Sequence, residues 1–127
     1  MSYIVRSGNL TEAPELSTSE SGTKYVRASV IVNDRERQED GSYKDSGTIR
    51  YNLTIFRSAA EQLVETAKRS GNVRVLFAGD YKVREYTRKD KTTGISHDVV
   101  VDEIGVSLTG QSVVVEKAGA PSSDESL

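Results

Sequence analysis

Cationic and aromatic side chains recur between residues 48 and 86 at spacings suited to binding a nucleic acid. They alternate with apolar residues in two segments, of which the first carries Arg50 and Phe56 on one side and the second carries Lys82, Arg84 and Tyr86. Guanidinium and ammonium groups attract phosphate, and aromatic rings stack on bases. The combination predicts a surface for a nucleic acid strand.

Both segments are expected to be β-strands, because successive side chains of a strand point to opposite faces. The residues expected to face a core are Ile49, Tyr51, Leu53 and Ile55 in the first strand and Val73, Val75, Phe77, Tyr81 and Val83 in the second. The residues expected to face outward are Arg50, Asn52, Thr54 and Phe56, and then Arg74, Lys82, Arg84 and Tyr86.

The residues between these strands predict a helix. Ser58 and Glu61 have the spacing of a capping box at its start, and Gly71 follows its last turn. The apolar stripe at helical spacing consists of Ala60, Leu63, Val64 and Ala67, and the last turn carries Lys68 and Arg69.

The rest of the chain predicts three more strands and their connections. These strands are expected at residues 3–10, 24–33 and 97–104, and the alternation of the second one places Arg27 on its polar side. The connections are a turn-rich link at 13–22, a charged hairpin at 34–47 with Gly41 near its tip, and a polar loop at 88–96 that contains Arg88, Lys89 and Lys91.

Composition favours one domain, since 127 residues can bury a core without disulfide or metal staples. The chain has no cysteine, and its 17 basic and 19 acidic residues require any anion-binding surface to arise from segregated charge. Residues 1–10 lack the apolar run of a signal peptide, and no stretch approaches the roughly 20 apolar residues of a membrane span. We therefore expect a cytoplasmic, nucleoid-associated protein with no membrane partner.

Five strands with one helix between the third and fourth predict an all-β fold, the five-stranded OB barrel, in which strands 2 and 3 and two long loops bind oligonucleotides. The sequence also resembles the bacterial single-stranded DNA-binding protein family over roughly residues 3–108, with features of an actinobacterial-type member or paralogue. The matching residues are Gly8, Asn9 and Leu10, then Pro14, Glu15 and Leu16, then Ser21 and Gly22, then Ala60 and Glu61, and finally Gly79.

The resemblance implies a homotetramer, a dimer of dimers, that coats single-stranded DNA in replication, recombination and repair without sequence preference or catalysis. It also implies that Phe56 and Tyr86 are stacking aromatics and that Lys82 and Arg84 contact phosphate. With the outward and loop cations, the candidate single-stranded DNA site comprises Arg27, Arg50, Phe56, Arg74, Lys82, Arg84, Tyr86, Arg88, Lys89 and Lys91. The simpler alternative is that these strand cations only keep sheet edges soluble.

Two aromatics that the family commonly has are missing, and the chain contains no tryptophan. Arg50 stands at one of these positions, and Arg35 and Glu36 stand near the other. An arginine can both stack on a base and pair with phosphate, so Arg50 compensates in part. Binding is expected to depend more on charge and less on stacking than in relatives.

The domain is expected to span residues 1–115, with residues 111–115 as a possible extra strand that resembles an actinobacterial extension clamping a neighbouring subunit. Residues 116–127 are expected to be a short, disordered polar tail. Its Asp124, Glu125 and Leu127 form a weak version of the tip with which the family recruits replication and repair proteins. The alternative is a tail that only adds solubility.

No catalytic scheme, cofactor or metal site is predicted. His97 is the single histidine and has no placed nucleophile or second ligand, so we expect a surface or pairing role. The acidic residues of the 34–47 hairpin do not have EF-hand spacing. The alternatives to a DNA binder are an OB-fold protein-interaction module and a binder of single-stranded RNA.

Overall fold

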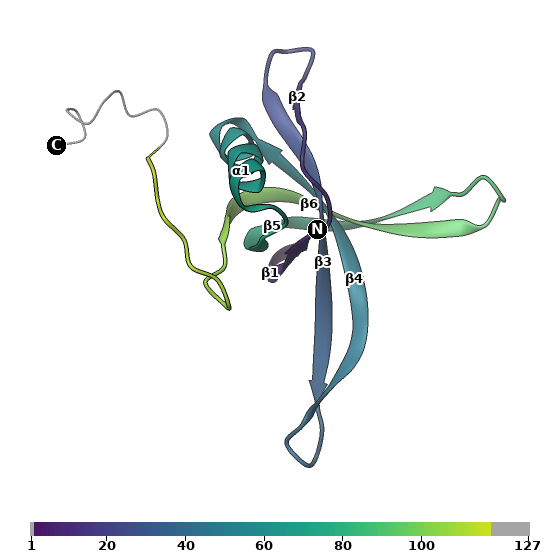
Figure 1. Cartoon of the computed structure of the whole chain (residues 1–127). Helices are drawn as coiled ribbons and strands as arrows, with labels where there is room; N and C mark the ends of the chain where they lie inside the picture. Colours follow the sequence, from purple (N-terminus) through teal and green to yellow (C-terminus); the bar gives the residue numbers. More distant parts are fainter. Residues whose placement is uncertain (1, 118–127) are drawn as a thin grey trace.

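The computed structural model describes residues 2–117, apart from the side chains of residues 45 and 46. Its elements are β1 Ser2–Leu10, β2 Leu16–Thr18, β3 Lys24–Arg37, β4 Tyr43–Phe56, α1 Arg57–Ser70, β5 Arg74–Thr87 and β6 Thr93–Val106 (Figure 1). The predicted tail residues Asp124, Glu125 and Leu127 lie outside the described residues.

Five of the strands form a closed ring in the order β1, β5, β6, β4, β3. Neighbouring strands pair antiparallel except β4 and β6, which run parallel. The ring closes where Asn9 lies opposite Ile31 and Leu10 lies opposite Val30. The predicted OB barrel, with its helix between the third and fourth barrel strands, is therefore confirmed.

The barrel interior is filled by the inward residues of the alternating strands. Phe77, Leu53 and Ile55 are among its fully buried side chains, and burying each contributes about 1.5–3 kcal/mol. The helix packs its predicted stripe against this core through Ala60, Leu63 and Ala67. Its end is also as predicted, because the Gly71 N–H donates to the Ala67 carbonyl.

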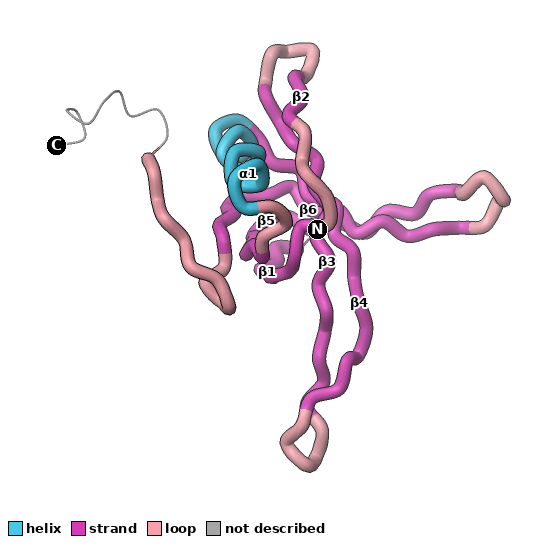
Figure 2. The backbone as a smooth tube through the Cα atoms, viewed as in Figure 1, coloured by secondary structure: helices cyan, strands magenta, loops and turns pink. Residues whose placement is uncertain are grey.

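Two long hairpins leave the barrel, β3–β4 and β5–β6 (Figure 2). Each of their strands is 14 residues long, which extends β3 beyond its predicted end at residue 33. Val83 lies on the β5–β6 hairpin and is 49% exposed, so its predicted place in the core is wrong. The alternation of β5 continues past the barrel, where there is no interior for Val83 to enter.

The capping box predicted from Ser58 and Glu61 is also wrong. The helix begins at Arg57, and its N-cap is Phe56, two residues before Ser58, with no side-chain hydrogen bond. Arg57 has φ 58°, a left-handed conformation that turns β4 directly into α1. Glu61 instead pairs with Lys24 at 3.5 Å.

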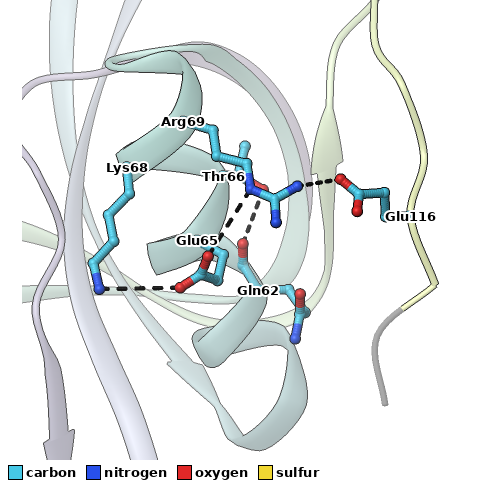
Figure 3. Close-up of polar contacts among 6 residues, drawn as sticks. All are labelled: Gln62, Glu65, Thr66, Lys68, Arg69 and Glu116. Atoms are coloured by element: carbon cyan, nitrogen blue, oxygen red, sulfur yellow. Dashed lines mark hydrogen bonds and ion pairs between the residues drawn. The ribbon is translucent and has the colours of Figure 1, made fainter. Parts of the chain in front are cut away.

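Residues 111–117 form no strand, which corrects the predicted extra strand at 111–115. The segment runs beside α1, which offers no free backbone edge for pairing, and an ion pair joins Arg69 to Glu116 (Figure 3). Val114 and Val115 are exposed. The strand outside the ring is instead β2, which pairs with β3 within the link predicted at 13–22.

The helix α1 lacks the length and apolar character needed to cross a membrane, and it is the one helix within residues 2–117.

Gly79 lies where the backbones of β5 and β6 approach closely. The register shifts here, so that Ala78 lies opposite Glu103 and Gly79 lies opposite Val101, leaving Asp102 as a bulge. A Cβ atom on Gly79 would overlap the carbonyl group of Val100. The glycine is therefore required by backbone packing.

Replacing Gly79 with Ala should lower the free energy of unfolding by about 1–3 kcal/mol, because backbone atoms must move to admit the methyl group. Gly105→Ala, on the neighbouring strand with open space at its Cβ, is the matched control and should change stability by less than about 1 kcal/mol. Urea unfolding at pH 7 measures both. Equal stabilities of the two variants would contradict this role of Gly79.

Candidate nucleic-acid interface

Strand register places the predicted polar residues on one continuous face. Thr54 and Asn52 of β4 lie opposite Arg27 and Ser29 of β3. The parallel pairing sets Asn52 beside Asp98 of β6. On β5 and β6 the opposed pairs are Lys82 with Asp98, Arg84 with Ser96 and Tyr86 with Gly94. The face therefore crosses β3, β4, β6 and β5 without interruption.

Phe56 lies at one end of this face and is 39% exposed. Its ring is tilted by 46° from that of Tyr25, with 6.4 Å between the ring centres. The Arg27 guanidinium lies 6.0 Å from the centre of the Tyr25 ring. An aromatic surface and a cation therefore lie together where a base and its phosphate could be held.

Tyr86 lies toward the other end, on the β5–β6 hairpin, and is 42% exposed. Its ring covers Gly94, where a Cβ atom would overlap the ring. The Arg88 guanidinium lies 5.6 Å from the ring centre, and its Nη1 donates to the Thr93 carbonyl at 2.7 Å. These contacts orient the Tyr86 ring.

A hollow of about 490 Å³ lies between β4 and the β5–β6 hairpin. Arg50 reaches it from β4 and also pairs with Glu12 at 3.7 Å. The residues that line the hollow are Arg50, Asn52, Arg84, Tyr86, Ile95, Ser96 and His97. Three of them, Arg50, Arg84 and Tyr86, are predicted site residues.

His97 belongs to this hollow, a location that sequence reasoning missed. Its Nδ1 lies 2.7 Å from the Tyr81 hydroxyl, and the two rings stack with 6.0 Å between centres and 6° between planes. In the sheet, His97 lies opposite Val83 of β5 and Tyr51 of β4. Alternation alone assigns His97 to the core side, and only the parallel register of β4 and β6 brings it to the edge of the hollow.

Asp98 is the acidic residue at the centre of the face. Its Oδ1 accepts hydrogen bonds from Ser96 Oγ at 2.5 Å and Asn52 Nδ2 at 3.3 Å, and its Oδ2 accepts one from Arg84 Nε at 3.0 Å. Burial tends to raise the pKa of Asp98, but the bonds from Ser96, Arg84 and Asn52 outweigh it and lower the pKa below the ordinary 3.8. Asp98 is thus ionised at neutral pH.

The three loop cations lie at the tip of the β5–β6 hairpin, where Lys91 has a left-handed φ of 71°. Arg88 and Thr92 close the turn through the Arg88 N–H and the Thr92 carbonyl. Asp90 accepts bonds from the Thr92 hydroxyl and backbone, which lower its pKa. The turn therefore holds Arg88, Lys89 and Lys91 beside the face that carries Tyr86.

Arg74 is not brought to this face. It lies at the far end of β5, opposite Asn9. Its backbone N–H donates to Gln111 Oε1 at 3.2 Å, and its carbonyl accepts from Gln111 Nε2 at 2.8 Å. Its Nε is buried and has no hydrogen-bond partner within the described part of the chain. Arg74 anchors the turn that follows β6.

Within residues 2–117 there is also no group of three or more His, Cys, Asp or Glu side chains that could hold a metal ion.

The sequence model of a protein family, described as the single-strand binding protein family, matches residues 1–107. The chain belongs to this family. A relative named single-stranded DNA-binding protein, from Mycobacterium leprae, is 35% identical over 113 residues, covering 87% of this chain and 66% of that protein. Single-stranded DNA-binding protein 2 of Streptomyces coelicolor is 30% identical over 112 residues, covering 87% and 55%.

The chain thus spans about two thirds of the mycobacterial relative and about half of the Streptomyces relative. A solved structure supports the same fold. The crystal structure of the small single-stranded DNA-binding protein from Streptomyces coelicolor superposes with a TM-score of 0.70 at 23% identity, covering 86% of this chain and 96% of that one. The predicted family and the actinobacterial character of its relatives are therefore confirmed.

The lowered pKa of Asp98 predicts how this site affects stability. A carboxyl group whose pKa is lower in the folded state stabilises the fold above its unfolded pKa, and this contribution is lost as the pH falls through the folded pKa. Asp98→Asn should therefore lower the free energy of unfolding at pH 7, and the difference from the original chain should shrink below pH 3.8. Urea unfolding at pH 7 and pH 3 measures this. A difference that is the same at both pH values would contradict it.

Proposed function

We propose that this chain binds single-stranded DNA without sequence preference and protects it during replication, recombination and repair. The observation that carries the proposal is the continuous face that joins Phe56 to Tyr86, with Arg50, Lys82 and Arg84 between them. Cations on such a groove follow the phosphates, and aromatic rings stack on successive bases whatever their identity. The names of the relatives support the same role.

A single strand fits this face better than a duplex does. Bases in a duplex are stacked on one another, so the rings of Phe56 and Tyr86 would have no base face to contact. A single strand can turn its bases toward both rings while its phosphates follow the cations. We propose a role of binding alone, with no catalytic step and no cofactor.

We also propose that the protein is a homotetramer arranged as a dimer of dimers. Support comes from β1, which pairs with β5 from Ser2 to Asn9 but meets β3 only at Asn9 and Leu10. Most of its second edge is thus open to pair with another copy. Tyr3, Val5 and Leu76 expose apolar surface on the neighbouring strands.

We also propose a domain at residues 1–115 and a tail at residues 116–127. The tail is proposed as a weak contact for replication and repair proteins. A cytoplasmic location with nucleoid association follows from the proposed ligand.

Binding to an oligo-dT strand should fall with salt, because each neutralised phosphate on a single strand contributes about −0.7 to the slope of log K against log salt. Fluorescence anisotropy with labelled oligo-dT measures the slope, and a matched oligo-U strand tests preference for DNA. No binding at low salt would contradict the proposal.

Arg50→Gln should weaken this binding and reduce the magnitude of the salt slope by about 0.7, because one phosphate contact is lost. Arg69→Gln is the matched control, since Arg69 is comparably exposed at 61% against 55% for Arg50 and is also ion-paired, but lies on α1. The control should bind like the original chain. Equal losses in both variants would remove Arg50 from the site.

Phe56→Leu should weaken binding by about fivefold or more, because stacking on an aromatic is worth about 1–3 kcal/mol per base. Leucine keeps an apolar side chain at the start of α1 but offers no ring, whereas Phe56→Trp keeps the ring and should retain affinity. The same anisotropy titration compares the two. Unchanged affinity of Phe56→Leu would show that Phe56 does not stack on DNA.

A further inference from the structure

The ionised side chain of Asp98 lies inside the cationic face. It is 33% exposed, and its strand neighbours are Asn52 on β4 and Lys82 on β5. A strand of phosphates that follows Arg50, Lys82 and Arg84 must therefore pass beside a carboxylate of its own sign. Like charges that lie close together repel each other.

The hydrogen bonds of Asp98 also occupy a cation that the DNA would use. Arg84 directs its Nε to Asp98 Oδ2 at 3.0 Å. A guanidinium binds phosphate best when its charge and its fork of N–H donors are both available. In the free protein, part of the charge of Arg84 is already balanced by Asp98.

The carboxylate is held firmly in this position. Ser96 and Asn52 donate to its Oδ1, and Asn52 also donates to Ser96 Oγ at 3.0 Å, which closes a small network between β4 and β6. Asp98 therefore cannot turn away from the face without breaking these bonds. The network keeps a negative charge between the phosphate-binding cations.

We propose that Asp98 is an affinity-limiting residue, an internal competitor that phosphate must displace from Arg84. The inference rests on the proposed binding of single-stranded DNA. When a strand binds, a phosphate takes the place of the Asp98 carboxylate at Arg84. The Asp98 charge also makes the net positive charge of the face one unit smaller than it would be with a neutral residue. Such a residue lowers the affinity for each strand and speeds its release. The same carboxylate stabilises the folded protein.

Asp98→Asn tests this directly in the full chain. It removes the charge and keeps the shape, and the variant should bind labelled oligo-dT about three- to fivefold more tightly at pH 7 and fixed salt. Freeing Arg84 should also steepen the slope of log K against log salt by about 0.7. A purely structural role of Asp98 would not steepen this slope.

Asp102→Asn is the matched control for overall charge, because Asp102 lies on the β6 bulge and accepts a hydrogen bond from the Tyr3 hydroxyl at 2.7 Å, away from the face. Its affinity should stay within twofold of the original chain. In an Arg84→Gln background, the increase in the logarithm of the oligo-dT affinity caused by Asp98→Asn should be at most half as large. A full gain there would show that Asp98 does not act through Arg84 and would overturn the proposal.

The outcomes separate this inference from the function on which it rests. If the original chain fails to bind oligo-dT at low salt, the proposed function is lost. If that chain binds but Asp98→Asn binds equally or more weakly, the proposal that Asp98 competes with phosphate is rejected. Weaker binding would show instead that Asp98 positions Arg84. Should Asp98→Asn fail to fold, Asp98→Ser provides the same neutral test with a hydroxyl partner for Asn52.

Discussion

The parallel pairing of β4 with β6 is the contact on which the rest of this structure depends. It runs over four residue pairs, from Tyr51 opposite His97 to Thr54 opposite Val100. On one side of it lie the β3–β4 hairpin and Arg50, and on the other lie the β5–β6 hairpin and Tyr86. A shift of one residue would turn the outward residues of one hairpin into the barrel and divide the face into two halves.

The face combines two kinds of interaction that differ in reach. Charge acts over a Debye length of about 8 Å at physiological salt, whereas stacking needs direct contact. Phe56 and Tyr86 lie at separate ends of the face, and the cations lie between them. Electrostatic attraction can therefore hold a strand loosely along the face before either ring is engaged.

Much of the fold was accessible from the sequence because alternation is a local property of each strand. It predicted the barrel strands, the helix stripe and the outward position of Arg50 and Tyr86. The errors arose where neighbouring structure overrides local preference. Val83 alternates correctly but lies beyond the barrel, and the left-handed Arg57 starts the helix before Ser58 can cap it. The hollow beside His97 and the network of Asp98 depend on register between distant strands, which no local pattern encodes.

The ion pair between Arg69 and Glu116 joins the end of the described chain to α1. In Figure 1, residues 111–117 lie on the side of α1, whereas the β5–β6 hairpin extends to the opposite side. A reporter dye or surface tether attached near residue 117 would accordingly start from the side of the molecule opposite the β5–β6 hairpin. The geometry makes this end of the described chain a suitable attachment point for single-molecule measurements.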